Sequence, residues 1–322
     1  MTNYDININI EVVFYTEYVM DKTKYNDYTL LIIYFLFAFC WATKNLLPLN
    51  DIFICGVCGV VLGIGVIICQ KIKLPEYLCR GIGVFAAAMT IVAVDRFLLP
   101  ASTNAITIIK SVFLPVASGA MFMDGVFVGP TPTGKTKAFV GAMSSFCLTI
   151  GILLTTWITG VDSAAVTFPT NNIATFIQNT FFGACVCCFL ALSRHIKLQR
   201  MVYIFPIALV CTTAFNYFNL NGWIFAGSII AAFISSILVG IVHRQNDTGY
   251  LVILTPTIYS CCPGGALHKF FTAIITFDTA NILPCTLTLA YNVAGLYIGV
   301  MAGTLLMNKI TKVKSQDFKK AF

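Results

Sequence analysis

About ten long runs of apolar residues dominate this chain of 322 residues. A helix needs roughly 20 residues to cross about 30 Å of hydrocarbon, and most of these runs meet that length. With 58% apolar and only 10% charged residues, the chain has too few polar side chains to cover a water-soluble body. We therefore predict an all-α membrane protein with about ten transmembrane helices. The predicted spans are residues 28–46, 51–70, 81–99, 105–128, 137–160, 173–193, 200–217, 222–243, 250–276 and 281–308.

Basic residues test this count, because Lys and Arg concentrate in cytoplasmic loops. Ten spans place 16 of the 20 basic residues on the same side as both termini, whereas the loops on the other side contain only Lys44 and Arg96. The distribution predicts a multi-pass protein of the plasma (inner) membrane with both termini in the cytoplasm. Residues 1–27 would form a short cytosolic or interfacial arm, and residues 309–322 a basic cytosolic tail.

Charge and cysteine content argue against several other classes of protein. The net charge of +7 is spread thinly along the chain, so we expect no nucleic-acid partner. Nearly all of the 13 cysteines lie in apolar runs, where thiols act as small buried hydrophobic groups. Cys55 and Cys58 form a C-x-x-C pair, but no His or second pair is near them in the sequence. Since no Ser/His/Asp, paired-acid or metal-binding pattern appears across the spans, we expect no cofactor, no metal and no enzyme.

Residues 129–136, G-P-T-P-T-G-K-T, match the phosphate-loop pattern G-x-x-x-x-G-K-[ST]. A true phosphate loop follows a strand and opens a helix, so that its backbone N–H groups surround the nucleotide. This segment joins two predicted spans, and its two prolines remove backbone donors. We interpret it as a cytoplasmic loop in which Lys135 and Lys137 fix the topology.

Two segments in the middle of the chain share a pattern. Residues 115–125 and 260–270 align with Ser118-Gly119 over Pro263-Gly264, and each segment lies in the fourth span of its half. The halves are residues 28–160 and 173–308, joined by a linker at 161–172. Because five is an odd number of spans, the two halves enter the membrane from opposite sides. This is the inverted-repeat plan of many secondary transporters, in which the substrate binds at the bilayer midplane between broken helices.

Pro263 predicts a break in the second of these spans. Proline has no N–H to donate, and its ring clashes with the carbonyl of Tyr259, while Gly264 and Gly265 tolerate non-helical backbone. Backbone groups freed at this depth are tolerated only against protein or a water-lined cavity. The break therefore forms either a polar cavity or a kinked helix whose freed groups are satisfied by its neighbours, and the sequence leaves both open.

Ionisable residues within spans are costly and are candidates for function. They are Lys110, Asp124, His268 and Lys269. We expect Lys269 and His268 to attract a carboxylate on the outer side of the cavity. Asp124 would act on the cytoplasmic side as a proton or cation site, and His268, which can titrate near neutral pH, would couple transport to protons. The alternative for Lys110 and Asp124 is that their side chains extend to the nearest interface.

These segments also resemble the threonine/serine exporter family, whose members have two membrane modules that are sometimes separate chains. Both modules are fused here. The end of the first module and most of the second are matched. The matching segments are 105–158 with the G-x-x-x-T-G loop at 129–134, and 174–306 with Phe225–Gly240, I-Y-S-C-C-P-G-G-A-L at 258–267 and a last span containing Gly295 and Gly299.

The chain departs from the family pattern in two places. Ser118 stands where the family usually has Pro, and the cytosolic region that precedes the first span in longer members is largely missing. The resemblance implies export of threonine, serine or related small amino acids, or of small dicarboxylates, driven by an ion gradient.

From these observations we predict a secondary active transporter that works as an antiporter. Its small-molecule substrate, an amino acid or a carboxylate, would cross the bilayer in exchange for a coupling ion, which we expect to be a proton. The rival prediction is a non-transporting membrane subunit or scaffold of the same fold. The predicted substrate-binding residues are Ser118, Gly119, Pro263, Gly264, Gly265, His268 and Lys269, and those predicted to couple the ion are Asp124 and His268.

Overall fold

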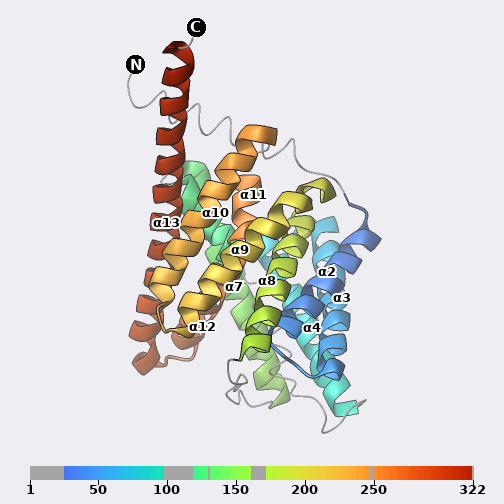
Figure 1. The fold of residues 1–322 in the computed structure, drawn as a ribbon. Helices are drawn as coiled ribbons and strands as arrows, with labels where there is room; N and C mark the ends of the chain where they lie inside the picture. Colours follow the sequence, from blue (N-terminus) through green and yellow to red (C-terminus); the bar gives the residue numbers. More distant parts are fainter. Residues whose placement is uncertain (1–24, 98–118, 130, 161–171, 247–249, 321–322) are drawn as a thin grey trace.

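The computed structural model describes residues 25–97, 119–129, 131–160, 172–246 and 250–320, and within these ranges the chain is helical without a strand (Figure 1). Two short 3-10 turns, η1 (Leu198–Arg200) and η2 (Tyr259–Cys261), accompany the α-helices. The α-helices are α2 (Asp27–Lys44), α3 (Leu49–Lys71), α4 (Glu76–Phe97), α6 (Gly119–Val128), α7 (Pro132–Thr159), α8 (Ile173–Ser193), α9 (Met201–Leu220), α10 (Ile224–Asn246), α11 (Tyr250–Thr257), α12 (Gly264–Ile275) and α13 (Thr279–Lys320).

Eight helices of the described chain are long and apolar enough to cross a membrane, and the bent pair formed by α11 and η2–α12 raises the number to nine. The helical architecture predicted from hydropathy is thus confirmed for the described chain, with eight or nine helices that have the length and composition of membrane spans. The predicted span 105–128 is represented by α6 only, since Lys110 and Ser118 lie outside the described residues. A tenth span therefore stays a prediction.

Most boundaries fall within a few residues of those expected, but the C-terminal end differs. The predicted tail at 309–322 continues α13 as helix as far as Lys320. The apolar part of α13 ends at Met307, and beyond it the helix extends past its neighbours (Figure 1). No helix-breaking Gly or Pro occurs between Met307 and Lys320, so nothing in the sequence ends the helix where its apolar part ends.

Small residues let the helices approach closely. A side chain at Gly59 of α3 would collide with the carbonyl of Tyr34 in α2, one at Gly81 of α4 would press on Cys147 of α7, and one at Gly299 of α13 would meet the carbonyl of Ile229 in α10. Lipid tails are as apolar as the helices, so close van der Waals packing at small residues is what holds membrane helices together.

Two buried clusters form the core. The first lies among α2, α3, α4, α7 and α8, and the second among α9, α10, α11 and α13. Helix α2 packs against α8, which joins the first half (α2–α7) to the second (α8–α13). Tyr259 of η2 belongs to the first cluster although it comes from the second half, and its ring lies 6.3 Å from that of Phe37. The break in the second half is therefore packed against the first half.

The two ends of the bundle differ in charge. Lys71 at the end of α3 pairs with Asp27 at the start of α2, and Tyr25 donates a hydrogen bond to the carbonyl of Ile196, just after α8. We call this end, where the chain also carries Lys197 and Arg200, the basic end. Helices α4, α7, α9 and α11 begin there, and the turns at 45–48, 221–223 and 276–278 lie at the opposite end.

Candidate functional site

The break predicted at Pro263 is present. Helix α11 ends at Thr257, the chain passes through η2, α12 begins at Gly264, and the helical segments on the two sides are bent by 48°. Several freed backbone groups bond locally: Cys262 N–H donates to the Tyr259 carbonyl at 3.0 Å, and the Thr257 hydroxyl donates to the carbonyl of Leu254 at 2.8 Å. Some of the polar backbone groups at the break therefore form hydrogen bonds within their own segment, as expected for a kinked helix.

The two segments that the sequence aligned touch each other. Gly119 is the first residue of α6 and Gly264 the first residue of α12, and a Cβ atom added to Gly119 would lie 2.6 Å from the Gly264 nitrogen. Both glycines and Pro263 are buried, and Gly265 is half-buried. The first turns of two helices from different halves thus meet in the interior of the bundle, and Ser118, the remaining residue of this set, lies outside the described chain.

Asp124 forms a half-buried ion pair that the sequence analysis did not foresee. Arg194, which caps the C-terminus of α8, donates from Nη1 to Asp124 Oδ2 at 2.9 Å, and the Thr255 hydroxyl donates to the other carboxylate oxygen. The exposed fractions of the Arg194 and Asp124 side chains are 12% and 14%. Nothing in the sequence relates positions 124 and 194, because their contact depends on how α6 packs against α7 and α11.

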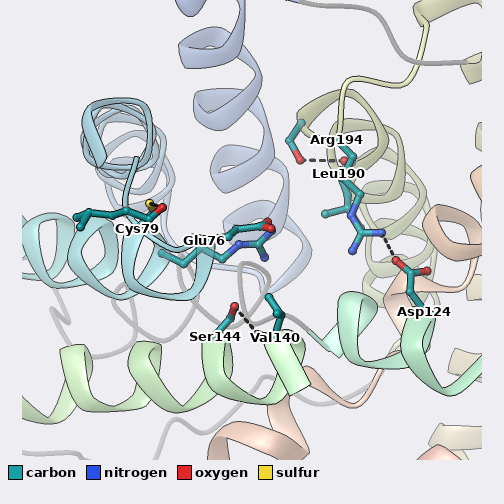
Figure 2. A network of polar contacts seen from close by, with 10 residues as sticks. Glu76, Cys79, Asp124, Val140, Ser144, Leu190 and Arg194 are labelled. Carbon is teal, nitrogen blue, oxygen red and sulfur yellow. Dashed lines mark hydrogen bonds and ion pairs between the residues drawn. The ribbon is translucent and has the colours of Figure 1, made fainter. Parts of the chain in front are cut away.

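A second ion pair lies close to the first, on α4. Arg80 donates to Glu76 at 2.6 Å across one helical turn, with exposed fractions of 19% and 44%. Figure 2 shows Glu76 and the Asp124–Arg194 pair as parts of one network of polar contacts. Four charged side chains, from α4, from α6 and from the C-terminal end of α8, therefore gather on the basic-end side of the chain break.

The hydroxyl of Tyr259 lies within electrostatic range of the two arginines. It is buried, the residue being 5% exposed, and among the described residues it has no hydrogen-bond partner. It is near enough to both Arg80 and Arg194 to interact with their charges. We call the group of Glu76, Arg80, Asp124, Arg194, Thr255 and Tyr259 the arginine cluster.

His268 and Lys269, on the other side of the break, lie in different surroundings. His268 is buried, and its Nδ1 is 3.0 Å from the hydroxyl of Thr149 in α7, which connects α12 to the first half. Lys269 is exposed. Successive residues of a helix point about 100° apart, so the α12 face that buries His268 cannot also bury Lys269.

Neutral hydrogen bonds continue from the break toward the opposite end. The hydroxyls of Thr212 and Ser260 are 2.8 Å apart, and Asn216 donates to Thr180 at 3.3 Å. Lys44, half-buried at the end of α2, lies over the ring of Trp41 at 4.6 Å. This side of the break is therefore polar but contains few charges.

Other features of the described chain fall outside this region. The segment 129–131 follows helix α6 and not a strand, and Thr131 caps α7 by accepting a hydrogen bond from Gly134 N–H at 3.0 Å. Within the described ranges, no group of three or more His, Cys, Asp or Glu residues is placed to hold a metal ion. A surface pocket of about 370 Å³ lies at the opposite end, where Trp223 and Tyr291 contribute to its lining, and none of the predicted site residues borders it.

Comparison of this chain with models of protein families, with curated proteins and with solved structures returns no match.

Proposed function

We propose that this protein is a secondary active transporter that exports small amino acids or small carboxylates through a site at the chain break. The observation that carries the proposal is the contact of Gly119 with Gly264. It brings the first turns of two short helices, one from each half, together inside a helical membrane protein. Helix N-termini carry unpaired N–H groups and a partial positive charge, and in many transporters such ends face the substrate at mid-membrane depth.

Helix packing supports the proposal that the halves are inverted repeats. In the first half α2 packs on α3, α3 on α4, α4 on α7 and α6 on α7. In the second half the same order recurs: α8 on α9, α9 on α10, α10 on α13 and α12 on α13. If residues 98–118 supply the remainder of the fourth span, each half has five spans, and two such halves in one chain have opposite orientations. We propose this ten-span arrangement.

The charge difference between the two ends supports a topology. Lys and Arg concentrate on the cytoplasmic side of membrane proteins, so we propose that the basic end faces the cytoplasm and that both termini lie there. The arginine cluster would then be reached from the cytoplasm, where an exporter takes up its substrate. We place the protein in the plasma (inner) membrane.

We propose Gly119, Pro263, Gly264 and Gly265 as the backbone surface on which the substrate is held, with Ser118 adjoining it. His268 and Asp124 are proposed to couple transport to protons. His268 is buried one turn after the break, and Asp124 lies half-buried one and a half turns after Gly119. Ionisable groups in such positions are common in proton-coupled transporters.

One observation favours the alternative of a non-transporting membrane subunit. The backbones at Gly119 and Gly264 touch, so in this conformation little space separates the two broken segments. For a transporter, this contact is a closed gate that opens when the halves move relative to each other. For a scaffold, it is permanent.

Counterflow in proteoliposomes distinguishes these two functions. Vesicles containing the purified protein are loaded with unlabelled threonine, serine or succinate, and uptake of the same labelled compound is followed with and without a pH gradient. A transporter accumulates label transiently, and a proton-coupled one responds to the gradient. Absence of exchange for all three compounds, in protein shown to be folded, would favour the scaffold.

A further inference from the structure

The Asp124–Arg194 pair is expensive for the protein to maintain. Charges removed from water lose hydration, and their mutual attraction often does no more than offset that loss. Ionisable side chains inside a membrane protein therefore point to function. This pair lies one and a half helical turns from the contact of α6 with α12, and Thr255 of the broken helix contacts it.

The chemistry of the pair matches a particular kind of solute. A guanidinium group forms parallel hydrogen bonds with a carboxylate. The Arg194 side chain that binds Asp124 would therefore equally bind the carboxylate of a bound molecule. Asp124, in turn, accepts hydrogen bonds from a guanidinium and a hydroxyl and would equally accept them from an ammonium group. An α-amino acid carries both groups on one carbon atom.

Tyr259 supplies an independent indication of a ligand. Buried polar atoms are nearly always hydrogen-bonded, yet its hydroxyl has no partner among the described residues. The hydroxyl lies within range of the charges of Arg80 and Arg194. A hydroxyl donor beside two cations is a suitable environment for an anionic group.

We infer that the arginine cluster binds the zwitterionic head group of a small α-amino acid, with the carboxylate on Arg194 and the ammonium group on Asp124. The inference rests on the proposed transport function and specifies its substrate class. Tyr259 donates to the same carboxylate, and Arg80 adds positive charge nearby. The amino acid enters between the two members of the ion pair, so both charges of the protein and both charges of the solute stay matched.

When the solute leaves, Arg194 and Asp124 pair again, as they do in the structure. Succinate fits less well, since its second carboxylate would face that of Asp124.

Ligand binding to the purified full chain in detergent tests this inference independently of transport. The probes are L-serine, serinamide, which has no carboxylate, glycerate, which has a hydroxyl in place of the ammonium group, and succinate. Loss of one charge-assisted hydrogen bond weakens binding by about tenfold or more, so wild-type protein should bind serine at least about tenfold more tightly than each of the others. Equal binding of serine and serinamide, or no binding of serine, overturns the inference.

Variants assign the two contacts. Arg194→Gln should weaken the binding of serine and glycerate, whereas Asp124→Asn should weaken that of serine and leave glycerate unchanged or tighter. Tyr259→Phe, which keeps the packing of the ring, should weaken serine binding by about threefold to tenfold. Asp27→Asn, which removes the exposed ion pair with Lys71 outside the cluster, serves as the control and should leave serine binding unchanged. Serine affinity that is unchanged in folded Arg194→Gln protein contradicts the assignment.

The analogue series on wild-type protein remains decisive if a variant does not fold. Counterflow separates this inference from the proposed function. Selective serine binding without exchange leaves the site in place and removes the transporter. Exchange of serine that Arg194→Gln and Tyr259→Phe do not alter keeps the transporter and removes the site.

Discussion

The polar groups on the two sides of the chain break are of different kinds. On the basic-end side Asp124 and Arg194 form a half-buried ion pair, and Arg80 and Glu76 form a second pair. On the other side the contacts are neutral, such as that of His268 with Thr149 and that of Thr212 with Ser260. A charged solute would therefore meet charges of both signs on one side of the break and mainly hydroxyl and imidazole groups on the other.

This difference indicates where recognition and release would occur. Matched charges bind a zwitterion selectively, because each part of its head group replaces a partner that is already present. Hydroxyl groups hold such a solute less tightly and so favour its departure. An exporter needs the tighter site on its cytoplasmic side, which is the side to which we assign the basic end.

The largest effect is expected where the two sides meet. Gly119→Leu places a side chain against the backbone of Gly264. Because the atoms that it meets belong to the backbone, no side-chain rotation can relieve the clash. We expect exchange to be abolished and the free energy of unfolding to fall by about 3 kcal/mol. Counterflow and thermal unfolding in detergent measure the two effects.

Gly240→Ala is the matched control for this substitution. Its new methyl group would contact only the flexible side chain of Met307, the nearest atom being at 3.1 Å. Wild-type exchange in Gly119→Leu protein would show that the contact between α6 and α12 is not part of the path.

A smaller effect is expected from the ion pairs of the basic-end side. Asp124→Asn removes the negative charge that Arg194 faces in this half-buried pair, and we expect a loss of about 2–3 kcal/mol in the free energy of unfolding. Glu76→Gln affects the more exposed pair and should cost less than about 1 kcal/mol. Chemical denaturation of both variants in mixed micelles compares them, and equal losses would mean that the two pairs are equally screened by water.

The sequence predicted the framework of this region better than its contacts. Periodic apolar runs fix helices, and Pro263 followed by two glycines fixes a break, since both are local properties of the chain. The alignment of Gly119 with Gly264 was also visible, as a repeat. Arg194 and Tyr259 were not identified as site residues, because a long side chain at a helix end and a tyrosine in an apolar run have no local signature of their partners.

The sequence also did not predict which side chains of α12 face the interior. His268 and Lys269 are neighbours in the chain and were assigned one role together. Which of them faces inward depends on the rotation of α12 about its axis. That rotation is set by its packing on α7 and α13.

On the neutral side the effect of one substitution should be modest. Thr149→Val keeps the shape of the side chain but removes its hydrogen bond to His268, and we expect the free energy of unfolding to fall by about 1–2 kcal/mol. Thr286→Val, which removes only an exposed hydroxyl bonded to its own helix, should change it by less than about 0.5 kcal/mol. Similar thermal unfolding of both variants would show that the Thr149–His268 bond does not stabilise the contact between α7 and α12.

The smallest effect is expected for Lys269→Ala. The side chain is exposed, and no ion pair or hydrogen bond of Lys269 is present in the described part of the chain, so the substitution removes no contact that the fold depends on. Exposed substitutions of this kind change stability by about 0.5 kcal/mol or less, and exchange of serine should stay within about twofold of wild type. The initial rate of counterflow at several serine concentrations measures the effect. A tenfold rise in the apparent KM for serine would contradict this expectation. It would mean that Lys269, and not the arginine cluster, binds the carboxylate of the substrate, and that recognition takes place on the neutral side of the break.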